Sequence, residues 1–195
     1  MADSAELSQK DIKTLFGAMG EELATYGSQF AFIQLRVSAE HFVVPLCGLS
    51  VERIVRLLKP DQYHVYFERK LPGFKQGPVD LVLIPIANNG NDELDKAYCF
   101  EFKMAWFSGI QQNLSGINKD IEKLNGYNRG FIIAVLFSFD KKLSWAPYSH
   151  EGDMEQLVRK VISSVGLPIY EGHEYSISNH EVAGKLKLLA WSAIR

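Results

Sequence analysis

The chain has 195 residues, which is long enough for a single domain, 1–195, with a substantial hydrophobic core. Hydrophobic residues make up 47% of it and charged residues 23%, a composition that excludes a globally disordered protein. The formal net charge of −2 excludes nucleic-acid binding through bulk positive charge, so a nucleic-acid partner would need a local basic surface.

The N-terminal part is predicted to contain a helix over Ser8–Tyr26. Apolar residues recur there at helical spacing, and Ser8 with Asp11 forms a capping-box-like start in which Asp replaces the usual Glu. The next stretch, Gly27–Leu46, is compatible with either a strand or a buried helix, because periodicity does not separate the two in a short apolar run.

A short helix is predicted over Ser50–Lys59. Pro45 and Gly48 are expected to break whatever element precedes it, and Ser50 is expected to be its N-cap. Glu52 falls in the first turn, where a carboxylate interacts favourably with the helix dipole. From spacing alone, this dipole role is the preferred interpretation of Glu52.

Three strands are predicted next, one over Tyr63–Leu71 and two in a β-hairpin over Gly77–Trp106. The hairpin flanks are rich in β-branched and aromatic residues, whereas its middle consists of Asn, Gly and Asp, which tolerate turn geometry. Asp80 lies on the first strand of the hairpin, and Glu101 and Lys103 lie on the second.

The turn bounds the register of this hairpin. In an antiparallel pair the numbers of opposed residues have a constant sum, and a turn centred between Gly90 and Asn91 sets it to 181, with Asp80 opposite Glu101. A loop over 88–95 sets it to 183, with Asp80 opposite Lys103. Both registers put these three residues on one face, and the aromatic residues of the second strand on the other, because side chains alternate along a strand.

The face that carries Asp80 is otherwise apolar, since it includes Val82 and Ile84. A carboxylate in apolar surroundings is costly unless a charged group meets it. Two carboxylates about 5 Å apart on opposed strands can hold a hard cation between them. An ordinary solvated ion pair would account for Glu101 and Lys103 taken alone, but it does not account for Asp80.

Glu68, on the preceding strand, is a third candidate acid. If the loop between the strands is centred near Phe74, the pair sum is 148 and Glu68 lies opposite Asp80. The competing interpretation, which we prefer, is an exposed glutamate beside Arg69 and Lys70.

The rest of the chain alternates between helices and strands. An amphipathic helix is predicted over Ser108–Tyr127, and the near-continuous apolar run of Arg129–Asp140 predicts a strand that is buried on both faces. Because a helix joins this strand to the hairpin, it is expected to run parallel to its neighbour. Another helix follows over Asp153–Val165, and His173–Ser178 and Lys185–Ala193 are predicted as closing strands. The whole pattern indicates an α/β protein with a mixed central sheet flanked by helices.

No N-terminal segment resembles a signal peptide, and the longest apolar run, Phe131–Phe137, is far too short to cross a bilayer. Cys47 and Cys99 lie in apolar runs, which is typical of buried free thiols and not of a disulfide framework or a zinc site. We therefore expect a cytoplasmic protein without a membrane partner.

The spacing of Asp80, twenty intervening residues and then Glu101-Phe102-Lys103 resembles the PD-(D/E)XK nuclease superfamily, the restriction-endonuclease-like fold. The first element departs from the family pattern, because one residue separates Pro78 from Asp80. The predicted order of elements from 50 to 140 agrees with the αβββαβ core of that family. The resemblance implies a nuclease-like core at about 50–140, a helical segment at 1–49 and a further helix and strands at 141–195.

Two helical segments extend the resemblance. Ser50–Val55 resembles the helix before the first core strand, and this implies an active-site role for Glu52 in place of the dipole role. Lys119–Leu124 resembles the D-x-x-K-L helix of several nuclease-like families, which implies that Asp120 and Lys123 orient Lys103 or contact backbone phosphate. An ordinary solvated ion pair remains an open alternative for Asp120 and Lys123.

The resemblance implies a Mg²⁺-dependent hydrolase of phosphodiester bonds, with Mn²⁺ able to substitute and DNA as the expected substrate of an endonuclease; RNA stays open. Asp80, Glu101 and the backbone carbonyl of Phe102 are the implied metal ligands. Lys103 is implied to position or deprotonate the attacking water, and Glu52 to serve as a further acid.

Two alternatives remain open. One is a non-catalytic, regulatory or nucleic-acid-binding protein on the same fold, because a fold does not fix function. The other is an enzyme whose DNA-binding surface is completed by a partner subunit or by a homodimer. The near-neutral charge favours the first alternative and the small size of the chain fits the second, whereas the intact set of Asp80, Glu101 and Lys103 argues against an inactive protein.

Overall fold

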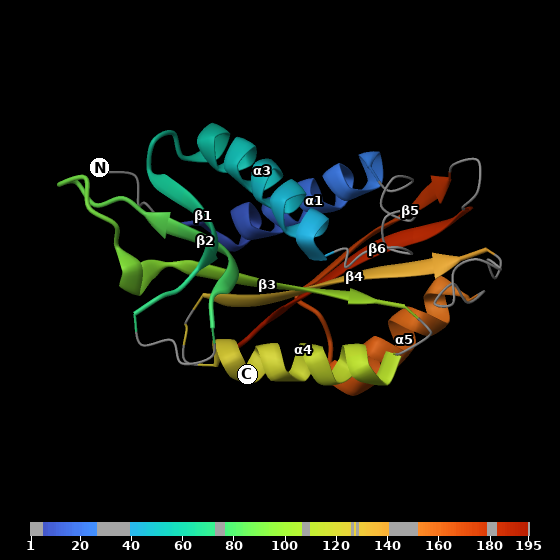
Figure 1. Cartoon of the computed structure of the whole chain (residues 1–195). Helices are drawn as coiled ribbons and strands as arrows, with labels where there is room; N and C mark the ends of the chain where they lie inside the picture. Colours follow the sequence, from blue (N-terminus) through green and yellow to red (C-terminus); the bar gives the residue numbers. More distant parts are fainter. Residues whose placement is uncertain are drawn as a thin grey trace.

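The computed structural model describes residues 6–26, 40–72, 77–106, 110–125, 127, 129–140, 152–178 and 183–194. In this part of the chain six strands form one sheet, and helices cover both of its faces (Figure 1). The strands are β1 (Tyr63–Arg69), β2 (Val79–Pro85), β3 (Tyr98–Ala105), β4 (Gly130–Phe139), β5 (Tyr170–Ser178) and β6 (Ala183–Ser192). The helices are α1 (Gln9–Thr25), α3 (Glu40–Leu58), α4 (Ile110–Leu124) and α5 (Met154–Val165), with a 3₁₀ helix, η1 (Leu94–Lys96), between β2 and β3.

The sheet is mixed, with the strand order β1-β2-β3-β4-β6-β5. The strands β1, β2 and β3 are antiparallel neighbours, β4 lies parallel to β3, and β6 pairs antiparallel with both β4 and β5. The parallel step falls where α4 joins β3 to β4, because parallel neighbours need a crossover connection. These observations confirm the predicted α/β class with a mixed sheet and the predicted parallel direction of β4.

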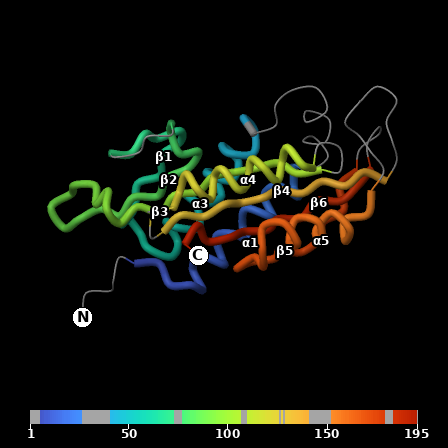
Figure 2. Tube along the Cα trace, turned by 90° about the horizontal axis from the view of Figure 1, so that it is seen from below, coloured from blue at the N-terminus to red at the C-terminus, as the bar shows by residue number. Residues whose placement is uncertain are grey.

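The two faces of the sheet carry separate hydrophobic cores. The helices α1 and α3 cover one face, and α4 and α5 lie together over the other (Figures 1 and 2). Alternation along β3 divides its side chains between these cores, so that Phe100 and Phe102 face α1 and α3, whereas Cys99 and Ala105 face α4 and α5. Glu101 and Lys103 therefore belong to the α4 face.

The first helix forms as the sequence predicts. The hydroxyl of Ser8 accepts a hydrogen bond from the backbone N–H of Asp11 at 3.2 Å, and the Asp11 carboxylate accepts one from the Ser8 N–H at 2.8 Å. This reciprocal pair is a complete capping box. The buried stripe of α1 includes Leu15, Phe16 and Met19, which pack on the sheet.

The prediction of a separate helix that begins at Ser50 is wrong. Helix α3 runs without interruption from Glu40 to Leu58, so Ser50 is a buried residue of its interior and Pro45 lies within it. Residues 40–46 of the ambiguous stretch are helical, and 27–39 lie outside the described residues. Packing overrides the local signals here, because the apolar stripe continues across Pro45 and the ring of Phe67 lies directly over Gly48, where a Cβ atom would come within 2.1 Å of it.

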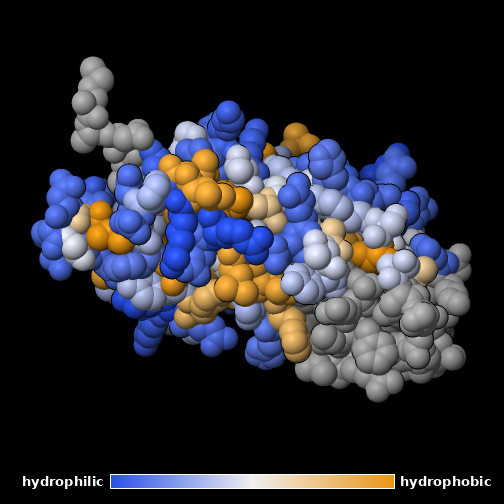
Figure 3. Space-filling model, turned by 90° about the horizontal axis from the view of Figure 1, so that it is seen from above, coloured by the Kyte–Doolittle hydropathy of each residue, from blue (hydrophilic) through white to orange (hydrophobic). Residues whose placement is uncertain are grey.

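The outer side of α3 is partly apolar. Phe42, Leu49 and Leu57 are exposed on this helix, and Figure 3 shows apolar and strongly hydrophilic surface side by side on the face formed by α1 and α3. Among the described residues, no helix is long and apolar enough to cross a membrane. Cys47 and Cys99 are buried free thiols, as predicted, and burial raises the pKa of both.

Candidate active site

The observed register of the hairpin decides between the two predicted alternatives. Leu81 pairs with Phe100, Val82 with Cys99 and Leu83 with Tyr98, which is the register whose opposed residues sum to 181. The register that would set Asp80 opposite Lys103 is therefore wrong. Asp80 lies one residue before Leu81 on β2, and Glu101 lies one residue after Phe100 on β3, so the two carboxylates lie on neighbouring strands and on the same face of the sheet.

The strands β2 and β3 separate at this point. Their pairing stops at Leu81 and Phe100, whereas β3 continues to pair with β4 as far as Ala105. The Asp80 carboxylate fills the opening, because its Oδ2 accepts the backbone N–H of Phe102 at 2.8 Å. The N–H and C=O of one strand residue point to the same side, so the Phe102 carbonyl also faces the open edge near Asp80.

Helix α4 adds two charged residues above β3. Lys123 Nζ lies 2.5 Å from Glu101 Oε1, and Lys103 Nζ lies 3.3 Å from Asp120 Oδ2. Two ion pairs form between these elements because Glu101 and Lys103, two residues apart on the strand, share one face, and Asp120 and Lys123, three residues apart on the helix, also share one face. We call Glu101, Lys103, Asp120 and Lys123 the charge square; Asp80 at its edge brings the formal charge of the group to −1.

The charged side chains of this group are largely removed from water, which costs free energy unless the charges are paired. The side chain of Glu101 is 3% exposed, that of Asp120 13% and that of Lys103 25%. Burial raises the pKa of Glu101 to about 8, with a further contribution from the nearby Asp80 carboxylate, although Lys123 opposes the shift. Burial also raises the pKa of Asp120, against the opposing effect of the Lys103 ammonium.

Polar atoms without hydrogen-bond partners concentrate along the same strip. Within the described residues, four buried side-chain nitrogen or oxygen atoms make no hydrogen bond, and Glu101 Oε1, Asp120 Oδ2 and Asn113 Nδ2 are three of them. Each of the two carboxylate oxygens meets a lysine ammonium, at 2.5 Å for Glu101 and at 3.3 Å for Asp120. Charge pairing between β3 and α4 therefore compensates most of the buried polar atoms of this strip.

Gly116 on α4 is a residue that sequence reasoning did not assign to the site. A Cβ atom at this position would lie 3.3 Å from Cδ of Lys103 and 3.4 Å from its Cε, so the aliphatic stem of Lys103 crosses the helix over the glycine. Glycine in a helix interior costs about 1 kcal/mol relative to alanine. A mid-helix glycine four residues before an aspartate is the sequence signal that would have found this contact.

Two predicted residues are not brought to this group. Glu52 pairs with Arg56 on α3 at 2.6 Å, and α3 covers the face of the sheet opposite the charge square. The predicted pairing of β1 with β2 is confirmed, since Phe67 pairs with Leu81 and Arg69 with Val79 at a sum of 148. Glu68 nevertheless interrupts that pairing with a φ of +47° and is exposed, so it does not join Asp80.

A second polar cluster lies at the sheet edge. His64 Nδ1 lies 2.8 Å from Asp92 Oδ1, and the Tyr66 hydroxyl donates to Asp92 Oδ2 at 2.9 Å. The guanidinium of Arg69 lies over the Tyr66 ring, 4.1 Å from its centroid. Burial acts to raise the pKa of Asp92, but hydrogen bonds from His64 and Tyr66 lower it overall. The cluster therefore ties the β2–β3 connection to β1 through an ionised carboxylate.

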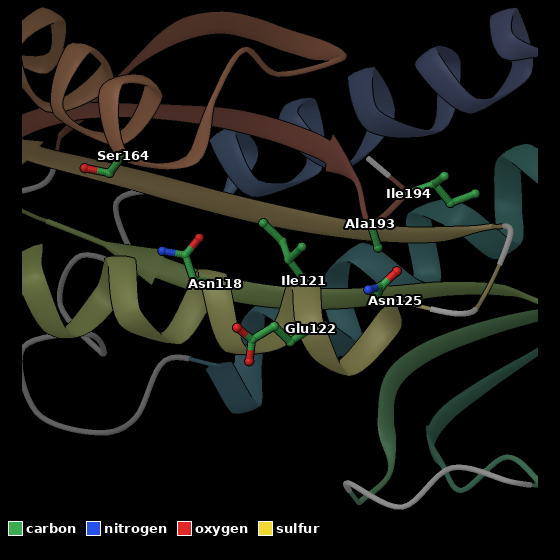
Figure 4. A pocket seen from close by; sticks show the side chains of 7 residues that line it. All are labelled: Asn118, Ile121, Glu122, Asn125, Ser164, Ala193 and Ile194. Carbon is green, nitrogen blue, oxygen red and sulfur yellow. The ribbon is translucent and has the colours of Figure 1, made fainter.

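A groove of about 650 Å³ lies on the other flank of α4, toward α5. Figure 4 shows its lining side chains, which come from α4, the residue after it, α5 and the residues after β6: Asn118, Ile121, Glu122, Asn125, Ser164, Ala193 and Ile194. None of the charge-square residues lines it. The groove and the charge square therefore occupy separate sides of the helix.

The residues present are compatible with magnesium. No group of three or more His, Cys, Asp or Glu side chains is placed to hold a metal ion in the part of the chain that the structure describes. Magnesium usually takes only one or two carboxylates and completes its shell with water and substrate oxygens. Asp80, Glu101 and the Phe102 carbonyl supply oxygen ligands of this kind, and Glu101 Oε1 already meets a cationic group, the Lys123 ammonium.

No protein-family model matches the chain, and no curated protein matches it. The resemblance to the PD-(D/E)XK superfamily therefore rests on the residues and on their arrangement. It remains a prediction.

Proposed function

We propose that this protein is a Mg²⁺-dependent nuclease of the PD-(D/E)XK type that hydrolyses phosphodiester bonds in DNA. The order α3, β1, β2, β3, α4, β4 agrees with the αβββαβ core expected of that family. The observation that carries the proposal is the convergence of the buried Glu101 carboxylate, the partly buried Asp80 carboxylate, a strand-edge carbonyl and two lysines at the point where β2 and β3 separate.

The metal ligands would be Asp80, Glu101 and the backbone carbonyl of Phe102. When bound there, magnesium would supply an activated water and neutralise charge on the phosphate. Asp80 already accepts the Phe102 N–H, and a carboxylate offers about four lone-pair positions, so this bond leaves capacity for a cation. It also fixes the orientation of the carboxylate before any ligand arrives.

Lys103 would orient the attacking water and stabilise the charge that develops on the phosphate. The ion pair with Asp120 and the passage of its stem over Gly116 fix the direction of the ammonium. The role predicted for Asp120, to orient Lys103, is consistent with this pair. Glu52 has no part in this mechanism, because its carboxylate pairs with Arg56 on α3, which covers the opposite face of the sheet.

A second candidate function is supported by the same ion pairs. The charge square already matches each carboxylate with an ammonium, and the net charge of −2 provides no bulk attraction for nucleic acid. These features favour a non-catalytic regulatory protein on this fold, or an enzyme that depends on a partner subunit or a second copy for DNA binding.

Calorimetric titration of Mg²⁺ and Mn²⁺, with a plasmid-nicking assay on the same samples, separates these candidates. Wild type, Asp80→Ala and the control Asp95→Ala are compared, because Asp95 is an exposed aspartate of the same β2–β3 connection. The proposal predicts metal binding and nicking in wild type and Asp95→Ala, and neither in Asp80→Ala.

Metal binding by a protein that cleaves neither plasmid DNA nor RNA would favour the partner-dependent enzyme. An absence of metal binding in the wild type, with DNA present, would refute the nuclease and favour the non-catalytic protein. Retained Mg²⁺-dependent nicking in Asp80→Ala would place the chemistry elsewhere in the chain.

A further inference from the structure

Lys123 occupies an unusual position among the charged residues of the site. Its ammonium lies 2.5 Å from Glu101 Oε1 and donates a hydrogen bond to the backbone carbonyl of Pro78 at 2.7 Å. The Lys123 side chain is only 12% exposed, although it belongs to a helix that faces solvent on its outer side. One ammonium group thus joins an oxygen of β3 to the carbonyl of the residue that precedes β2, at the point where these strands separate.

These two oxygens are of the kind that a hard cation binds, a carboxylate and a backbone carbonyl. Glu101 is also a proposed metal ligand, and Pro78 precedes Asp80 by two residues. An ammonium and a divalent cation beside one carboxylate repel each other, and they do so strongly at a buried site, where the effective dielectric constant is low. Lys123 and the metal therefore cannot both make full use of Glu101.

We propose that Lys123 is the resident counter-ion of Glu101 whenever that carboxylate is ionised, and that a divalent cation binds by displacing the Lys123 ammonium. The inference rests on the proposed metal site and deepens it by assigning how that site is loaded. Without a counter-ion, the ionised carboxylate of Glu101, which is only 3% exposed, would carry an uncompensated buried charge beside Asp80, which is strongly destabilising. Lys123 thus stabilises the metal-free protein and weakens its affinity for metal.

This arrangement has a consequence for the substrate. The displaced ammonium stays on α4 beside the site, because Lys123 is anchored in the last turn of the helix. There it adds positive charge next to the position of the scissile phosphate. Metal loading and substrate binding are then positively coupled, as linkage requires when one event releases a group that the other uses.

The test removes the ammonium and measures metal affinity alone. Mg²⁺ is titrated by calorimetry into wild type, Lys123→Met and the control Lys119→Met, in which an exposed lysine of the same helix is lost four residues earlier. We expect Lys123→Met to bind Mg²⁺ about tenfold more tightly or better, because displacing a charge-assisted contact no longer opposes binding. Lys119→Met is expected to stay close to wild type, since an exposed charge is screened.

Thermal unfolding with and without Mg²⁺ gives a second readout on the same proteins. We expect Lys123→Met to be less stable than wild type in EDTA and to gain more stability from Mg²⁺, because the metal then replaces the missing counter-ion. Lys123→Gln, which keeps a donor for the Pro78 carbonyl, takes the place of Lys123→Met if the methionine variant does not fold.

Equal or weaker Mg²⁺ binding in the Lys123 variants, with binding intact in the wild type, would overturn this inference and leave the proposed nuclease standing. Tighter Mg²⁺ binding in the Lys123 variants than in wild type and Lys119→Met would support it. No binding of Mg²⁺ or Mn²⁺ in any of the proteins would overturn the metal site itself, and the inference with it.

Discussion

The buried carboxylate of Glu101 makes the stability of the metal-free protein depend on pH in a direction that the structure fixes. Burial and the neighbouring Asp80 raise the pKa of Glu101 from 4.5 to about 8. Between these values the folded protein retains a proton that the unfolded chain has lost, so its stability falls as pH rises. Replacement of Glu101 by Gln removes this titration while keeping the shape of the protonated side chain.

The magnitude follows from the size of the pKa change. Each pKa unit corresponds to about 1.4 kcal/mol, so the free energy of unfolding should fall by up to about 1.4 kcal/mol per pH unit through this window. Over the whole window the loss is on the order of 4–5 kcal/mol, which is a large fraction of the stability of a typical domain. Above the folded-state pKa of about 8 the curve should flatten, because both states are then ionised at Glu101.

Urea unfolding followed by tryptophan fluorescence, in buffers that contain EDTA, measures this dependence. Wild type, Glu101→Gln and the control Glu122→Gln, at an exposed position of α4, would be compared between about pH 5.5 and about pH 8.5. Wild type and the control should lose stability with rising pH, and Glu101→Gln should lose much less. Parallel curves for wild type and Glu101→Gln would refute the assignment of a proton to Glu101.

Three further substitutions test the roles assigned above. Lys103→Ala should leave Mg²⁺ affinity nearly intact but slow plasmid nicking by about 100-fold or more, so equal turnover would remove Lys103 from the mechanism. Gly116→Leu should slow nicking by pushing the Lys103 stem aside while the melting temperature holds or rises, because Leu favours the helix by about 1 kcal/mol over Gly; nicking at the wild-type rate would show that the contact is immaterial. Glu52→Gln should leave nicking unchanged and alter stability by no more than about 0.5 kcal/mol, since its carboxylate pairs at the surface with Arg56; a clear loss of nicking would restore the role that the family resemblance implies.

Local signals predicted much of the fold. The alternation along Tyr98–Ala105 placed Glu101 and Lys103 on one face and the aromatic residues on the other, and the structure has this division. The turn at Gly90 and Asn91 was enough to predict the observed register as one of two alternatives. These predictions succeed because side-chain period and hairpin register are properties of a few neighbouring residues.

Local signals failed where packing competes with them. Pro45 and Gly48 indicate a break, yet α3 is continuous, because its buried stripe and the close approach of the Phe67 ring over Gly48 favour one helix. The spacing of residues favoured an interaction of Glu52 with the helix dipole, whereas the family resemblance favoured an active-site role for it. The structure places this residue with Arg56 on the far side of the sheet, since the path of α3 depends on contacts between distant segments.

The sequence by itself determined the order of most elements and the face on which Asp80, Glu101 and Lys103 lie, because these follow from hydrophobic period and turn chemistry. Only the tertiary structure decided which lysine meets which carboxylate. Lys123 reaches Glu101, and Asp120 reaches Lys103, because α4 returns antiparallel to β3 at a particular height and rotation. That placement is set by the packing of Leu114, Ile117 and Ile121 on the sheet, which no local pattern encodes.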